Sequence, residues 1–515
     1  MFTKADPSLQ VKSYIKAVFG YNLRLLSLCS PIMLEIELKF QIHDSRRSAL
    51  LKALDPKKST QIKLQAKYYD TPEQHLATAK AALRQRLEGN TWVQTFKASK
   101  NHLERFEHNA VLGELTQAPE LDLRVYEHDA EAAALFQHAV GGHADALELQ
   151  FETDIQRTLR VIEFQDSEIE VSLDIGEIRA KGRQQPVHEI EFELKRGSVQ
   201  DLLAFSFEWV KKYQLWLDVR SKAEFGHLLA ANHKVSPAKV AKPFLALKKH
   251  SPDHNVRMFV AQQLQHLLPH IAAISADVAE VEHVQQAHQA LKQLYLTVTV
   301  FKTWSTELSD RWSSQLAAFL EQFEQRAHLE QMQQRLVGML QNPNTALSLQ
   351  QDLLFAKEKL SQLVRSTQNV HHFLELLSFS FTQQADNTVL KTAAQTLLQQ
   401  QYKQLFDALQ QNTEQEFAHL DHLSEALDRL HFSFPILTQI YDVKNLQKYA
   451  KTLQDAQRAA EEYRSLSRSI AYIQDTELSP SDWFVLGWLT AKQELYAERV
   501  TQAAEQFLLS RKLLK

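Results

Sequence analysis

Two short stretches of the sequence carry charged residues at every second position. Residues 34–40 read L-E-I-E-L-K-F, with Glu35, Glu37 and Lys39 alternating with apolar residues, and residues 188–195 read H-E-I-E-F-E-L-K. Side chains two residues apart on a β-strand lie on one face, about 6.6 Å from each other. Like charges in such a column repel unless a cation compensates them. The pattern therefore indicates a divalent cation site, because hard cations prefer carboxylate oxygens.

Further charged columns separate by sign. Glu189, Glu191 and Glu193 share one face, and a third acidic column contains Glu168, Glu170 and Asp174. The basic or mixed columns and the remaining basic candidates are Arg84 with Arg86, Thr95 with Lys97, Arg105 with Glu107, Arg157, and Lys222. A solvent-exposed sheet face usually mixes signs, so separated columns favour the inward face of a closed sheet. A cavity lined in this way suits an anion that carries Mg²⁺ or Mn²⁺.

The elements that must position these residues differ between the two halves of the chain. Alternation and β-forming composition predict strands at 34–40, 82–87, 91–97, 106–112, 156–164, 168–175 and 188–195, and helices at 45–54, 130–139 and 198–212. Residues 231–250, with two prolines and several lysines, are interpreted as a linker. Residues 251–515 are rich in Gln, Ala and Leu, and their apolar periodicity predicts a helical bundle.

Length and composition limit the classes of protein. A chain of 515 residues is too long for one core, so we expect several domains. The net charge of −4 gives no overall attraction to nucleic acid or to an anionic membrane, and no apolar run is long enough to span one. Cys29 is the only cysteine, which excludes an intrachain disulfide and a thiolate metal cluster and fits the cytoplasm. Residues 1–32 are interpreted as a disordered tail or a mis-called extension upstream of Met33.

Residues 33–230 resemble the CYTH domain, the family of triphosphate tunnel metalloenzymes. The N-terminal signature E-x-E-x-K is read at Glu35–Lys39, and an ordered set of further blocks follows. These blocks are L-R-x-R at 83–86, T-x-K at 95–97, R-x-E at 105–107, S-L-D-x-G-E at 172–177, E-x-E-x-E at 189–193 and S-K-A at 221–223. One such block is a weak signal, but the ordered set is specific.

The resemblance implies an α+β multidomain protein that begins with an eight-stranded antiparallel β-barrel, or tunnel, and continues as an all-α bundle. It implies hydrolysis of inorganic triphosphate to pyrophosphate and phosphate with Mg²⁺ or Mn²⁺. The metal-side residues would be Glu35, Glu37, Glu189, Glu191 and Asp174. The substrate-binding residues would be Lys39, Arg84, Arg86, Lys97, Arg105, Arg157 and Lys222. The catalytic residues would be Lys39, Arg86 and Glu107.

Residues 251–515 resemble a CHAD domain in a depleted form. CHAD helices carry a dense basic series, whereas residues 284–295 retain His288 and Lys292, and residues 422–434 contain Arg429 as their single Arg or Lys. CHAD domains are associated with polyphosphate through that basic surface. Because acidic residues outnumber basic ones after residue 250, we do not expect strong polyphosphate binding. A scaffold, or a docking site for a protein partner, is the expected role.

Three other functions fit the same motifs. A CYTH cyclase would make cyclic AMP from ATP, but no aromatic or amide set can be assigned to a purine pocket. Thiamine triphosphate hydrolysis would use the same tunnel. A module that binds polyphosphate or nucleotides without cleaving them is the non-enzymatic alternative, and the complete set of Glu35, Glu37 and Lys39 argues against it.

Overall fold

The computed structural model describes most of the chain beyond residue 35. The described residues are 36–79, 81–99, 105–241, 245–336, 338–339, 342–382, 388–410, 418–440, 446–476 and 478–509. Glu35, Cys29 and the predicted extension 1–32 lie outside these ranges.

The first part of the chain forms one antiparallel sheet. Its strands are β1 (Ile36–Gln41), β2 (Thr60–Asp70), β3 (Ala81–Glu88), β4 (Thr91–Ser99), β5 (Arg105–Glu114), β6 (Glu148–Phe164), β7 (Ser167–Ala180), β8 (Arg183–Arg196) and β9 (Trp216–Leu217). Their order across the sheet is β5-β4-β3-β2-β6-β7-β8-β1-β9. The short helices between them are α2 (Arg47–Ala53), α3 (His75–Thr78) and α4 (Ala130–Val140), and three 3₁₀ turns lie at Asp44–Arg46, Leu123–Tyr126 and Gly141–Ala146.

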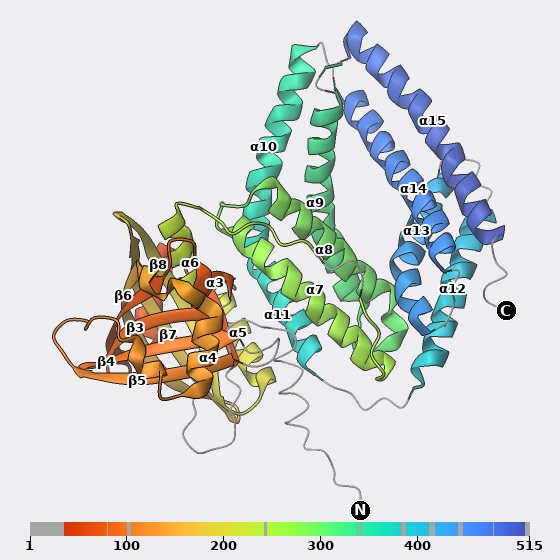
Figure 1. Ribbon diagram of the computed structural model, residues 1–515. Helices are drawn as coiled ribbons and strands as arrows, with labels where there is room; N and C mark the ends of the chain where they lie inside the picture. The colour runs from red at the N-terminus through yellow and green to blue at the C-terminus, as the bar shows by residue number, and fades with distance from the viewer. Residues whose placement is uncertain are drawn as a thin grey trace, which may run out of the picture. The chain divides into compact units, whose positions relative to one another are not determined.

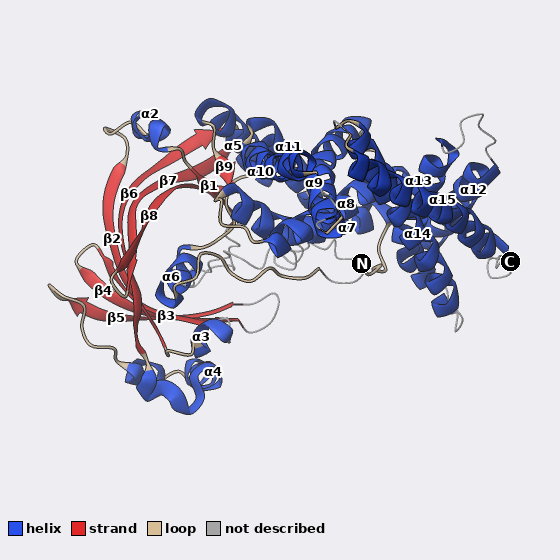
Figure 2. Ribbon diagram, turned by 90° about the horizontal axis from the view of Figure 1, so that it is seen from above, coloured by secondary structure: helices blue, strands red, loops and turns tan. Residues whose placement is uncertain are grey.

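This sheet confirms the predicted architecture, a β-domain followed by helices, but it differs from an eight-stranded barrel. The described residues contain nine strands, because the two-residue β9 adds to the edge of β1. Among the described ladders, β5 and β9 are the two edges, so no pairing closes the sheet into a ring. Figure 2 shows the sheet curved into an open trough, with β3, β4 and β5 forming one arm and β1, β7 and β8 in the other.

The outer face of the second arm is an apolar core under α5 (Val199–Tyr213). Phe40, Ile190 and Phe192 are fully buried there, and the Phe192 ring packs edge-on against Phe205 at 5.3 Å. Ser198 caps α5 by accepting a hydrogen bond from the amide of Asp201. Since residues alternate between faces along a strand, burying the apolar residues on this side puts the charged ones on the concave face.

The first arm has its own outer core. Leu83 of β3 and Phe96 of β4 pack with Tyr126 and with Phe136 of α4. Gln85, between the two arginines of β3, also belongs to this side, because its side-chain oxygen accepts a hydrogen bond from the Tyr69 hydroxyl at 2.8 Å. The arginines on either side of Gln85 must therefore point to the concave face.

Helix α6 (Lys222–Ala231) covers part of the concave face. It packs against β6, β7 and β8, and Figure 2 shows it inside the curve of the sheet. Phe225 and Ala230 of α6 join a buried cluster with Phe151 and Ile178. The helix begins after Ser221, whose hydroxyl accepts a hydrogen bond from the amide of Glu224 at 3.1 Å. This start places Lys222 in the first turn of α6.

The chain folds into two compact units that do not follow chain order. The first comprises the described residues up to Ala238 together with Leu268–His283 and Leu363–Phe381. It includes α11 (Thr367–Phe381), which packs on α5, and His371 Nε2 lies 3.0 Å from the carbonyl oxygen of Phe207. The sheet is therefore backed by a second layer of helix that comes from much later in the sequence.

The second unit is helical (Figure 1). Its helices are most of α7 (Pro252–Ser275), α8 (Val281–Val300), α9 (Asp310–Leu336), α10 (Pro343–Arg365), α12 (Leu390–Gln410), α13 (Ala418–Leu437), α14 (Leu446–Gln474) and α15 (Pro480–Leu509), with 3₁₀ turns at Lys302–Trp304 and Thr438–Ile440. Leu329, Ile473 and Val485 are among the residues of a core shared by α9, α10, α14 and α15. In the part of the chain that is described, no helix combines the length and apolarity needed to cross a membrane.

Candidate active site

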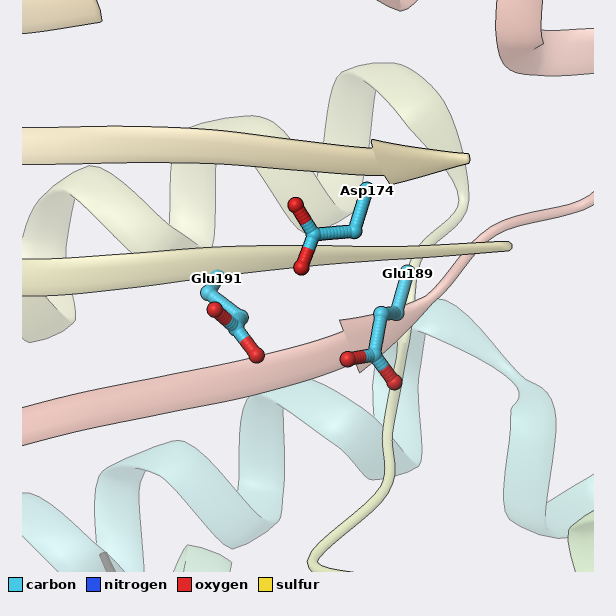
Figure 3. A group of neighbouring side chains, drawn as sticks. All are labelled: Asp174, Glu189 and Glu191. Atoms are coloured by element: carbon cyan, nitrogen blue, oxygen red, sulfur yellow. The ribbon is translucent and has the colours of Figure 1, made fainter. Parts of the chain in front are cut away.

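Three carboxylates meet on the concave face. Asp174 of β7 lies opposite Glu189 of β8 in the ladder, and Glu191 follows two residues later on the same side. One oxygen from each lies within 4.8 Å of the others. Figure 3 shows the three side chains grouped together from neighbouring strands. Asp174 and Glu189 are buried, so water alone does not balance their charge.

Three cationic side chains enter this acidic group. Lys222 Nζ forms ion pairs with Asp174 Oδ2 at 2.7 Å, with Glu191 Oε1 at 2.8 Å and with Glu189. Arg157 Nη2 lies 2.6 Å from both Asp174 Oδ2 and Glu191 Oε2. Lys39 Nζ lies 3.4 Å from Glu189 Oε2. Three positive and three negative groups therefore balance one another in this structure.

The proton affinities of the group reflect this crowding. Burial raises the pKa of Glu189, although Lys222 and Lys39 act in the opposite direction. Burial also acts to raise the pKa of Glu191, but Lys222 and Arg157 outweigh it and hold that pKa below its ordinary value. Burial would lower the pKa of Lys222, yet the carboxylates around it keep that pKa well above the usual range. Lys222 is thus a permanent ammonium.

The donor set fits a hard divalent cation. Asp174, Glu189 and Glu191 offer oxygen ligands from two adjacent strands, and the cluster already accommodates positive charge at its centre. Mg²⁺ and Mn²⁺ prefer such ligands. These three residues are the ones that would hold the predicted metal.

A basic arm faces this cluster across the trough. Arg84 and Arg86 on β3, and Lys97 on β4, share the concave face, because Arg84 pairs with Thr95 and Lys97 pairs with Ala82 in the same ladder. Arg86 donates a hydrogen bond from Nε to Glu88 at 2.8 Å. Arg84 differs: only 9% of it is exposed, and its Nε has no hydrogen-bond partner among the described residues. A buried guanidinium N–H without a partner is costly unless a ligand accepts from it.

The structure brings most of the predicted site residues together in two groups, the carboxylate cluster and the basic arm. The carboxylate cluster contains Lys39, Arg157, Asp174, Glu189, Glu191 and Lys222. Glu37 lies on the same face through its pairing with Glu193, and it contributes to the raised pKa of Arg157. The basic arm contains Arg84, Arg86 and Lys97. Arg105 and Glu107 are placed by backbone pairing alone, opposite Ser99 and Lys97, and Glu35 lies outside the described residues.

Two residues that the sequence reasoning missed contact the cluster through Lys39. The carbonyl oxygen of Arg220 accepts a hydrogen bond from Lys39 Nζ, and the Phe225 ring lies 5.7 Å below the same ammonium. The available signal was their closeness in sequence to Lys222. It was weak, because a main-chain contact leaves no mark on residue type.

Comparisons with known proteins found similarity in the part of the chain that carries this site. Residues 33–224 match the model of the CYTH domain. An inorganic triphosphatase of Haemophilus influenzae is 35% identical over 167 residues, which cover 32% of this chain and 45% of that protein. The match thus spans less than half the length of that relative.

Some solved structures also match parts of this chain, with lower sequence identity. The CHAD domain from the plant Ricinus communis has 12% identity and covers 53% of this chain and 97% of its own, with a TM-score of 0.44. A putative adenylyl cyclase from Hippeastrum, described as having a dominant triphosphatase activity, has 15% identity and covers 39% of this chain and 97% of its own, with a TM-score of 0.28. The CHAD resemblance of residues 251–515 stays a prediction from sequence. Residues 33–224 of this chain are similar to the CYTH domain family.

Proposed function

We propose that the concave face of the CYTH domain binds inorganic triphosphate and hydrolyses it to pyrophosphate and phosphate with the help of a divalent cation. The similarity to a protein named inorganic triphosphatase supports the reaction. The carboxylate cluster supports the metal requirement, since it offers three oxygen donors within 4.8 Å.

The main support for the proposal is the buried position of Arg84. Its guanidinium is buried on the wall of the trough, with an Nε that lacks a partner in the described part of the chain. Arg86 and Lys97 lie nearby on the same face. Guanidinium groups bind phosphate oxygens through short, charge-assisted hydrogen bonds. A compact polyanion lying between β3 and the carboxylates would satisfy Arg84, and the cation would compensate the like charges of phosphate and carboxylate.

The reaction needs charge neutralisation more than covalent chemistry. Water oxygen bonds to the terminal phosphorus, the bridging P–O bond breaks with its electrons going to pyrophosphate, and the water proton is released. A cation held by Asp174, Glu189 and Glu191 would polarise phosphoryl oxygens and favour ionisation of water. Arg84, Arg86 and Lys97 would neutralise the equatorial oxygens and the leaving pyrophosphate. Lys39 and Lys222 would supply further donors.

Phosphate release from tripolyphosphate, ATP and thiamine triphosphate, each with Mg²⁺ or Mn²⁺, tests the substrate. We expect release from tripolyphosphate. Cyclic AMP from ATP would instead establish the cyclase alternative, and faster release from thiamine triphosphate would establish that substrate. Binding without any product would establish the non-catalytic alternative.

Substitutions of the basic residues test the site. Lys39→Ala, Arg84→Ala and Arg86→Ala should each lower kcat by about a hundredfold or more, the usual loss when a donor to a developing charge is removed. Arg179→Ala is the matched control. Arg179 lies on β7, the strand that pairs with β6 and Arg157, but its side chain is half exposed and pairs with Glu177. Wild-type rates from all three purified site variants would reject this site.

A further inference from the structure

A short turn, residues 218–221, connects β9 to α6. We propose that Asp218 and Arg220 are positioning residues for the triphosphate site, and that their buried ion pair holds this turn in the shape that brings Lys39 and Lys222 to the carboxylates. The inference rests on the proposed function, and it assigns Arg220 to orienting other cations rather than to binding phosphate.

Asp218 is anchored to the strand that carries Lys39. Its amide donates to the carbonyl oxygen of Lys39 at 3.1 Å, which extends the pairing of β9 with β1 by one step. Its carboxylate is fully buried and accepts three hydrogen bonds from Arg220. The donors are the main-chain amide at 3.0 Å, Nε at 3.0 Å and Nη2 at 2.7 Å. A two-pronged contact of this kind fixes both the side chain and the backbone of residue 220.

The side chain of Arg220 does not face the site as a phosphate-binding arginine would. The guanidinium lies over the Phe225 ring, 4.8 Å from its centre, and both residues are buried. With its donors turned to Asp218, the residue offers its carbonyl oxygen to Lys39 Nζ instead. That carbonyl and Glu189 Oε2 together hold the ammonium of Lys39 on the site side of the turn.

The same turn sets the start of α6. Ser221 follows Arg220 and caps the helix through the amide of Glu224, so Lys222 is the first helical residue. From that position its ammonium reaches the carboxylates. A small movement of residues 218–221 would therefore displace two of the three cations at once. Misplacement of a reacting or stabilising group by about 1 Å can cost a hundredfold in rate.

Two substitutions remove the ion pair in different ways. Asp218→Asn keeps the shape but removes the charge, and Arg220→Lys keeps the charge but cannot make the two-pronged contact. For tripolyphosphate we expect kcat to fall by about ten- to a hundredfold. We expect KM to change by less than about threefold, because the basic arm on β3 and β4 is untouched. Circular dichroism and thermal unfolding identify which variants are folded.

Arg183→Lys is the matched control. Arg183 holds the other end of α6 by donating to the carbonyl oxygens of Leu229 and Ala230, both at 3.1 Å. It should leave kcat within about twofold of wild type if position at the Lys222 end is what matters. An equal loss of kcat in Arg183→Lys would assign the effect to general loosening of α6 and overturn the inference.

Other outcomes are equally decisive. A wild type that hydrolyses tripolyphosphate, together with unchanged kcat in folded Asp218→Asn and Arg220→Lys, overturns the positioning role alone. If both variants fail to fold, the pair serves fold stability and the positioning role is wrong. If wild type does not hydrolyse tripolyphosphate, the proposed function fails, and the positioning role that rests on it fails with it.

Discussion

Arg84 and Arg86 are two residues apart on one strand, but the structure gives them different surroundings. Arg84 is buried, with an unpaired Nε among the described residues, while Arg86 near the end of β3 pairs with Glu88. The sequence predicted that both face the same way, and the strand register agrees. It could not predict the difference, because burial at a given position depends on how the sheet curves. The division of roles among the carboxylates was beyond the sequence for the same reason.

Lys222 gives a prediction at this scale. Its ammonium lies among the carboxylates that would hold the metal, so it competes with a divalent cation when no substrate is bound. Lys222→Met should therefore bind Mn²⁺ at least tenfold more tightly in the absence of triphosphate. One unit charge near 4 Å is worth about 4 kcal/mol at an effective dielectric constant of about 20, and about 1.4 kcal/mol is enough for a tenfold change. Titration calorimetry measures this affinity. Unchanged or weaker Mn²⁺ binding by the folded variant would show that the cation does not use these carboxylates.

At the scale of elements, the alternation of apolar and polar residues predicted strands well, whereas Gly and Asn residues predicted the ends of strands poorly. The prediction of strands at 168–175 and 188–195 lies inside β7 and β8, and helix 198–212 matches α5 within one residue at each end. β2 was missed, although Ile62, Leu64 and Ala66 alternate with polar residues, because no Gly or Asn marks its ends. β9 is too short to leave a pattern, and its pairing with β1 is a tertiary event.

The junction of β8 and α5 gives a prediction about stability. Gly197 has φ +109°, and a Cβ added there would lie 1.9 Å from Ser167 Oγ. Gly197→Ala should therefore destabilise the first unit by about 3 kcal/mol, the sum of a strained backbone and an overpacked contact. Gly89→Ala is the control, because Gly89 has φ +65° with open space around it, and the strain alone should cost about 1 kcal/mol. Urea unfolding measures both, and equal losses would show that the Ser167 contact is relieved at no cost.

At the scale of the whole molecule, one helix from the later part of the chain belongs to the first unit. α11 packs on α5, and the Phe207 and His371 rings meet edge-on at 4.9 Å. Just before α11, Arg365 at the end of α10 places its guanidinium 5.4 Å from the Trp216 ring centre. Composition alone separated a strand-rich half from a helical half at about residue 250. It carries no information about which helix packs on which layer, because that depends on surface complementarity between distant segments.

Truncation tests this packing. A fragment of residues 33–238 lacks α11, so it should expose Phe207 and Trp216 and lose about 2 kcal/mol, which corresponds to a Tm about 4–8 °C lower for a domain of this size. Scanning calorimetry of the fragment and the full chain measures the difference. Phe207→Ser should lower the Tm of the full chain and leave the fragment nearly unchanged. A fragment as stable as the full chain would show that α11 adds nothing to the sheet.

The three cations within the carboxylate cluster also bear on what happens when metal is scarce. Because Lys39, Arg157 and Lys222 already serve as built-in counterions, the acidic residues do not repel one another when magnesium or manganese is withdrawn. Small domains that depend on zinc behave in the opposite way, since they do not fold without the ion. On the proposed function, removal of the ion would therefore stop turnover while the folded protein persists, and activity would return once the ion is restored.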